Sequence, residues 1–272
     1  MPALDNYPAD LEKRLKYKEY AMTRSHKYLG RPARLACIII LALASGKVAG
    51  APQEFDHSRF QRLLSVAVAN GRVDYGRFRN NNDFAAYLTS LEKASVGSLS
   101  TDEQLAFWIN AYNALTIRNV LDNPGMKRPT DIKGFFDGRK FRVAGKLLTL
   151  NDIENSIIRA QFKEPLIHFG LVCAARSCPP LLPNAYAARS VRAQLAKNAS
   201  AYLASEYNTY DSRSGALVLS KIFDWYKSDF GGDAGLRNFV KTYGTPQMQK
   251  ALTATPNIKI TFMEYDWTLN AK

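Results

Sequence analysis

Three histidines and three cysteines are a small supply for 272 residues, and this scarcity limits the chemistry open to the chain. The stretch "SVGS" lacks the G-x-S-x-G pattern of a serine nucleophile elbow. The stretch "DFGGDAG" does not follow a predicted strand, as a phosphate-binding glycine loop would. We therefore expect no cofactor, and we look for chemistry where histidine and cysteine come together.

The apolar run "LACIIILALASG" (Leu35–Gly46) is shorter than the roughly 20 residues that a membrane-spanning helix needs. Basic residues precede it and small residues follow it, which is typical of a secretory signal. We interpret residues 22–50 as a cleaved signal peptide and residues 51–272 as a single globular domain. Residues 1–21 are then an extension upstream of a start at Met22. The alternative is an uncleaved membrane anchor.

Charge in the expected mature chain is mildly basic. The whole chain has 37 Lys+Arg and 24 Asp+Glu; the first fifty residues hold nine and four of these, which leaves 28 against 20, or +8. No block of basic residues with interleaved aromatics is present, so nucleic acid is not an expected partner. We expect a periplasmic or secreted protein, without a transmembrane segment, that contacts an anionic envelope component.

Helical periodicity dominates the mature chain. Ser100 and Glu103 have the spacing of a capping box, and the helix they begin should end at "NPG". The sequence "KFRVAGKLLTL" predicts a hairpin, and "PLIHFGLVC" predicts a buried strand. Helices outnumber scattered strands, so we expect an α+β fold, helix-rich, around a small and mainly antiparallel sheet. The predicted helices are residues 58–69, 82–94, 103–121, 151–162, 190–206 and 236–243, with a turn-helix over residues 221–232.

Two side-chain amides and one carboxyl group lie on predicted helices beside apolar residues. Asn110 and Asn113 are three residues apart, and a buried amide without a partner costs about 1–3 kcal/mol. They must therefore reach loop backbone, each other or a ligand. Glu154 stands beside an isoleucine stripe, so it lies at the helix edge or turns inward toward a partner.

Several blocks together resemble a known family. They are "VDYGRF", "EQLAFWINAYNALTI", "LTLNDIENSIIRAQF", "HFGLVCAARSCPPL", "LSKIFDWYKSDFG" and "YDWTLN", from about Val73 to Asn270. The chain resembles the bacterial domain of unknown function 547 family, whose members are often exported. The resemblance places the recurring Glu, His and Cys of that family on Glu154, His168 and Cys178. Members usually carry a histidine after that Glu, where this chain has "IENSII".

These three residues suggest a thiol-dependent hydrolase or acyl transferase. Cys178 would be the nucleophile, His168 the general base and Glu154 the group that orients the imidazole. Cys178 precedes two prolines, so it could cap a short helix whose dipole lowers the thiol pKa.

Three alternatives stay open for the same stretch. A Cys173–Cys178 disulfide would leave a non-catalytic envelope binding or scaffold module. Cys173 could also be plain core. A zinc site is disfavoured, because His168 and Cys173 would lie on opposite faces of a strand. Asp224 and Asp229 fit helix-surface pairs as readily as acid–base work.

Overall fold

The computed structural model describes residues 54–272, and the predicted extension 1–21 and signal peptide 22–50 lie outside these residues. The described residues fall in one unit, Gly50–Lys272. They are helix-rich with short strands, which confirms the predicted α+β class.

Helix α3 (Thr101–Asp122) is the longest helix in the described part, and it is buried on almost every side. The predicted capping box is present: the Glu103 amide donates to Ser100 Oγ at 3.3 Å, and the Ser100 amide donates to Glu103 Oε2 at 2.7 Å. The helix ends at Asp122, and its C-cap Asn123 directly precedes Pro124. Because α3 has so little exposed surface, the other elements are arranged around it. None of the helices within residues 54–272 is both long and apolar enough to cross a bilayer.

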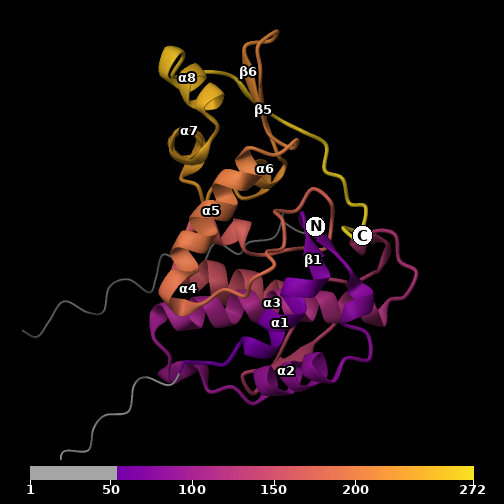
Figure 1. Ribbon diagram of the computed structural model, residues 1–272. Helices are drawn as coiled ribbons and strands as arrows, with labels where there is room; N and C mark the ends of the chain where they lie inside the picture. Colours follow the sequence, from indigo (N-terminus) through magenta and orange to yellow (C-terminus); the bar gives the residue numbers. More distant parts are fainter. Residues whose placement is uncertain (1–53) are drawn as a thin grey trace, which may run out of the picture. The chain divides into compact units, whose positions relative to one another are not determined.

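The remaining helices pack on two sides of α3. Figure 1 shows α1 and α2 on one side and α5 on the other, with α7 and α8 beyond α5. Contacts of α3 with α2 and α5, and of α5 with α7, agree with that arrangement. The α-helices besides α3 are α1 (Ser58–Ala67), α2 (Asn82–Glu92), α4 (Ala160–Phe162), α5 (Val191–Leu203), α6 (Ile222–Trp225), α7 (Gly232–Tyr243) and α8 (Pro246–Ala254).

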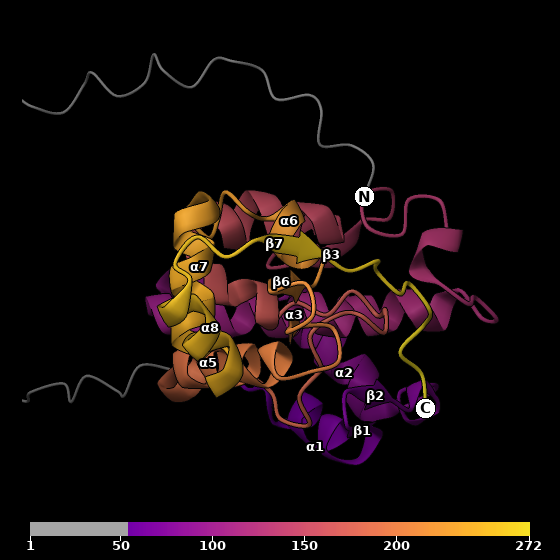
Figure 2. The ribbon, with the colours of Figure 1, turned by 90° about the horizontal axis from the view of Figure 1, so that it is seen from above.

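The strands of the described region form small separate sheets. β1 (Val68–Ala69) and β2 (Arg72–Val73) form an antiparallel pair, as do β3 (Phe141–Val143) and β4 (Lys146–Leu148). The second pair is the predicted hairpin. β6 (Ala216–Leu219) pairs antiparallel with β5 (Thr209–Asp211) and parallel with β7 (Ile260–Phe262). In Figure 2, β6 and β7 lie next to α6.

The predicted strand over "PLIHFGLVC" is wrong. Pro165–Phe169 forms a 3-10 helix, η5, and residues 170–173 belong to no strand. Pro165 suits the first position of such a helix because its missing N–H would have no partner there. The Glu164 side chain accepts the Leu166 amide at 3.2 Å and so caps the turn. The segment is buried as expected, but a short helix buries it.

Candidate functional site

The two amides on α3 hold loop backbone in place. Asn110 donates to the Tyr186 carbonyl at 2.8 Å and accepts from the Tyr186 amide at 2.9 Å. Asn113 donates to the Gly170 carbonyl at 2.8 Å and accepts from the Val172 amide at 3.0 Å. Of the partners that the sequence left open, both amides use loop backbone. They fix the segment on either side of the two cysteines to the central helix.

Cys173 and Cys178 are joined by a disulfide, with Cα atoms 6.2 Å apart. Tyr265 Oη lies 3.2 Å from each sulfur. Cys178 is buried, and no helix follows it, so the expected short helix after this residue is wrong. Pro179 and Pro180 explain the absence, since both lack an N–H and the residue before a proline avoids helical geometry. In this state Cys178 carries no free thiol, and no helix begins over residues 179–187 to lower a thiol pKa.

The disulfide loop, residues 173–178, also holds the C-terminal segment of the described chain. The Arg176 amide donates to the Thr268 carbonyl at 2.8 Å, and the Ser177 amide donates to the Asp266 carbonyl at 3.2 Å. The Asp266 amide in turn donates to Ser177 Oγ at 2.9 Å. The two segments are therefore braced as a short irregular ladder, with Tyr265 placed over the sulfurs.

His168 is buried on η5, and its partner is an aspartate. Its Nε2 donates to Asp229 Oδ2 at 2.8 Å, and its ring stacks on Tyr226 with centroids 3.9 Å apart. Among the described residues, no hydrogen bond links His168 to Cys178 or to Glu154. The imidazole is oriented as the triad hypothesis requires, but by Asp229.

Glu154 turns inward, the second of the two orientations left open by the sequence. Its carboxylate accepts from the hydroxyls of Tyr112, at 3.1 Å, and Tyr226. Burial raises the pKa of both tyrosines well above the usual value, and the Glu154 charge raises them further. The two hydroxyls therefore stay protonated and act as donors. Among the described residues, Tyr226 connects the two groups: its hydroxyl donates to Glu154, and its ring stacks on His168.

Arg159 completes a chain of charged groups. Its Nε and Nη2 donate to both oxygens of Asp229, at 2.6 and 2.7 Å, and its Nη1 donates to Asn155 Oδ1 at 2.6 Å. Burial alone would raise the pKa of Asp229. The hydrogen bonds from His168 and Arg159 outweigh burial and hold that pKa well below its usual range. Asp229 is therefore ionised at any physiological pH, and it accepts hydrogen bonds from both His168 and Arg159.

A π-helix places Glu154 and Arg159 on the same side of their segment. Residues Asp152–Arg159 form η4, and α4 continues from it. In an α-helix, residues five apart point about 140° away from each other. A π-helix bonds residues i and i+5, so such residues lie nearly in line. That change of winding brings Glu154 and Arg159 together around Tyr226, where Arg159 lies 5.0 Å from the ring centroid.

A small cavity opens beside this polar cluster, which we define as Glu154, Arg159, His168, Tyr226 and Asp229. Its volume is about 240 Å³, enough for a few water molecules or a small polar ligand. It carries both signs of charge, with the Arg159–Asp229 ion pair in its wall. The lining residues are Arg159, Lys163, Glu164, Ile167, Ser228 and Asp229. In the described part of the chain, no group of three His, Cys, Asp or Glu side chains is placed to hold a metal ion.

Sequence reasoning missed Arg159 and Tyr226 and left Asp229 among the surface pairs. The sequence did point to these residues, because "LSKIFDWYKSDFG" and "NSIIRAQF" belong to the blocks that carry the family resemblance. What the sequence does not reveal is that those two blocks meet.

Part of the chain matches a known family. Residues 96–203 match the family model described as "Protein of unknown function, DUF547". The chain thus resembles the DUF547 family. The matched range includes the two amides of α3, Glu154, Arg159, His168 and both cysteines of the disulfide. The DUF547 match stops before Tyr226, Asp229 and Tyr265, which complete the site from outside it. No curated protein and no solved structure matches the chain.

Proposed function

We propose that this protein is an exported, non-catalytic binding or scaffold module of the cell envelope. The observation that carries the proposal is the Cys173–Cys178 disulfide, because it removes the nucleophile that the enzyme hypothesis needs. A disulfide persists mainly in oxidising compartments, which supports an extracytoplasmic location. The signal-like pattern over residues 22–50 supports the same location.

The contacts of the polar cluster favour a structural or binding role over catalysis. Glu154, His168 and Asp229 are each engaged by other protein side chains. A buried polar network of this kind fixes one arrangement of the surrounding elements. The cavity beside Arg159 and Asp229 offers paired charges to a small polar ligand, and the basic mature surface favours an anionic envelope component.

Counting thiols tests this proposal directly. Protein isolated from the cell envelope without reductant is unfolded in guanidinium and titrated with a thiol reagent. The proposal requires that peptides containing Cys173 and Cys178 be recovered linked to each other in a non-reducing digest. Recovery of both as free, alkylated cysteines from a preparation trapped at harvest would refute it.

A second candidate function, a thiol hydrolase or acyl transferase active after reduction, is favoured by one observation. The His168–Asp229 pair holds an imidazole in one orientation, as a general base requires. In this reading Cys178 is the nucleophile and Glu154 supports the site through Tyr226.

The pH dependence of alkylation of the reduced protein separates the two candidates. The Cys173→Ser variant leaves Cys178 as the one thiol of the pair. A thiol activated by His168 reacts at half its maximal rate well below about pH 8.5, the value of an ordinary cysteine. The His168→Ala substitution should then slow the reaction at neutral pH. Half-reactivity at or above about pH 8.5, with no effect of His168→Ala, rejects the enzyme.

A further inference from the structure

The two cysteines of the disulfide differ in their exposure to solvent. Cys173 is half-buried, whereas Cys178 is only 5% exposed. Arg176, in the loop between them, is exposed, and its positive charge attracts an incoming thiolate. Access is one of the factors that decide which sulfur of a disulfide a thiolate attacks. A thiolate from solvent should therefore attack the sulfur of Cys173.

Hydrogen-bond donors surround the other sulfur. The Cys173 amide donates to Cys178 Sγ at 3.0 Å, and the Tyr265 hydroxyl donates to it at 3.2 Å. Burial raises the pKa of Tyr265 well above its usual value, so this hydroxyl stays protonated. Hydrogen bonds to a thiolate lower the pKa of its thiol, and a thiol of lower pKa leaves faster in exchange. Cys178 is therefore the better leaving group of the two.

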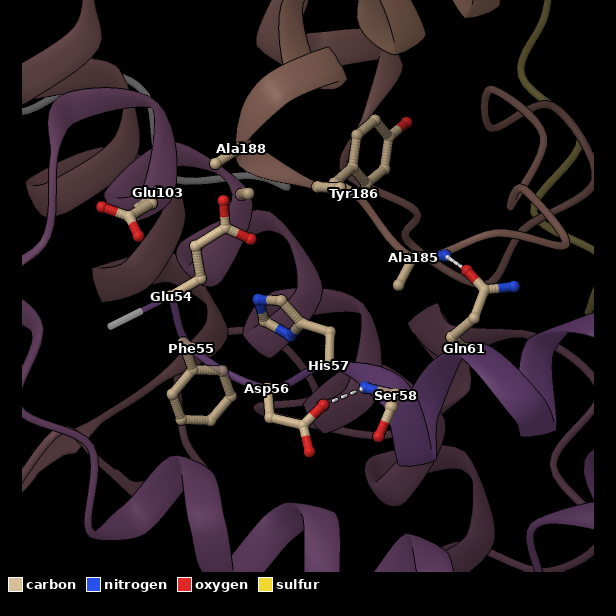
Figure 3. Close-up of a pocket in the computed structure, with 12 residues that line it drawn as sticks. Glu54, Phe55, Asp56, His57, Ser58, Gln61, Glu103, Ala185, Tyr186 and Ala188 are labelled. Atoms are coloured by element: carbon tan, nitrogen blue, oxygen red, sulfur yellow. Dashed lines mark hydrogen bonds between the residues drawn. The ribbon is translucent and has the colours of Figure 1, made fainter. Parts of the chain in front are cut away.

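Both histidines of the described residues are engaged elsewhere. His168 donates to Asp229, and Nδ1 of His57 lies 2.7 Å from the Tyr87 hydroxyl. Figure 3 shows His57 in the wall of a cavity of about 380 Å³ that no cysteine of the described chain lines. The stabilisation of a leaving thiolate thus depends on the backbone amide and the tyrosine hydroxyl.

Contacts that do not involve sulfur hold both ends of the disulfide loop. Before the loop, the Val172 amide donates to Asn113. At its end, the Ser177 carbonyl accepts from the Tyr202 hydroxyl at 2.6 Å, and Ser177 Oγ accepts the Asp266 amide. These hydrogen bonds remain when the disulfide opens, so the two thiols stay close together. The bond can therefore open and close again within the folded protein.

We propose that the Cys173–Cys178 bond is redox-active and exchanges with small thiols, with Cys173 as the sulfur that is attacked. The thiolate of a first thiol bonds to Cys173 Sγ, the bond between the cysteines breaks, and its electron pair leaves on Cys178 Sγ. The thiolate of a second thiol then attacks the first and releases Cys173. Two thiols are oxidised to one disulfide, and the two cysteines are reduced and take up the two protons that the thiols release. This inference goes beyond the function proposed above, which requires only that the bond is formed.

Trapping the mixed disulfide tests which sulfur is attacked. Full-length protein, purified without reductant, is mixed with reduced glutathione at neutral pH, quenched in acid and alkylated with N-ethylmaleimide. Trypsin cuts after Arg176, so the two cysteines fall in separate peptides, residues 164–176 and 177–189. We expect glutathione on the first peptide and N-ethylmaleimide on the second, roughly tenfold or more over the reverse pattern. Equal labelling, or glutathione mainly on the second peptide, would overturn the proposal.

Removing one hydroxyl tests the stabilisation of the leaving sulfur. Tyr265→Phe keeps the ring, which packs on Trp225 and Trp267, and removes the donor to Cys178. We expect dithiothreitol to reduce this variant about tenfold more slowly than the native protein. The matched control Tyr243→Phe removes a hydroxyl that contacts neither sulfur, so it should be reduced at the native rate. Unfolding temperatures confirm that both variants fold. A folded Tyr265→Phe protein reduced at the native rate, or a native protein that is reduced only after unfolding, contradicts the proposal.

Discussion

Opening the Cys173–Cys178 disulfide should destabilise the folded protein by a small and calculable amount. The bond closes a loop of only six residues, 173–178. The chain-entropy relation gives about 2 kcal/mol for a loop of that size at 25 °C. For a domain of this length, 1 kcal/mol corresponds to about 2–4 °C in the unfolding temperature. The Cys173→Ser/Cys178→Ser double variant should therefore unfold about 4–8 °C lower than the unreduced native protein.

The control is the response to a reductant. Tris(carboxyethyl)phosphine should lower the unfolding temperature of the native protein to that of the double variant and leave the double variant unaffected. Hydrogen exchange should show the loss of the disulfide locally. The Asp266 amide, which donates a hydrogen bond to Ser177 Oγ, should exchange faster. The reasoning is refuted if the native protein is demonstrably reduced and its unfolding temperature and Asp266 exchange stay the same.

Three further predictions concern other sites. Asp229→Asn removes the negative charge that faces both His168 and Arg159 and should cost about 2–3 kcal/mol at pH 7 in urea unfolding. Because the Asp229 pKa is depressed, the native protein loses this stabilisation only as pH falls below about 4, so the difference in free energy of unfolding between the two proteins should shrink there. Burial lowers the pKa of folded His57 to about 4, so as pH falls from about 6.5 the unfolded chain takes up a proton before the folded protein does. The free energy of unfolding should therefore drop by about 2–3 kcal/mol between about pH 6.5 and about pH 4. A His57→Gln variant whose free energy of unfolding keeps the same dependence on pH would contradict this. Gly235→Ala would place a Cβ 1.8 Å from the Phe230 carbonyl oxygen and should lower the unfolding temperature sharply, whereas Gly97→Ala, with open space around it, should change it little.

Local rules in the sequence predicted much of the helical framework. The capping box of α3 and the glycine-containing turn between β3 and β4 are determined by residues a few positions apart, and both were correctly predicted. Helix α8 was not predicted. Its N-cap Thr245 and the proline that follows were the available signal.

The site was predicted less well than the framework. The segment with His168, Cys173 and Cys178 was identified from the sequence, but η5 was predicted as a strand. A short apolar run fits a buried strand and a buried helix equally well. The π-helix could not be predicted either, since the side chains at 154 and 159 fit an α-helix as well. Asp229 is 61 residues beyond His168, so their pairing depends on tertiary packing that no local pattern encodes.

The end of the described chain lies beside β2 and Tyr75. Tyr75 donates to Asn270 Oδ1 at 2.6 Å across 195 residues, and the Lys272 amide donates to the Val73 carbonyl. Contacts this remote in sequence form late and slowly, because a long loop must close first. The contacts between residues 270–272 and the β2 region should therefore be among the last to form as the protein folds.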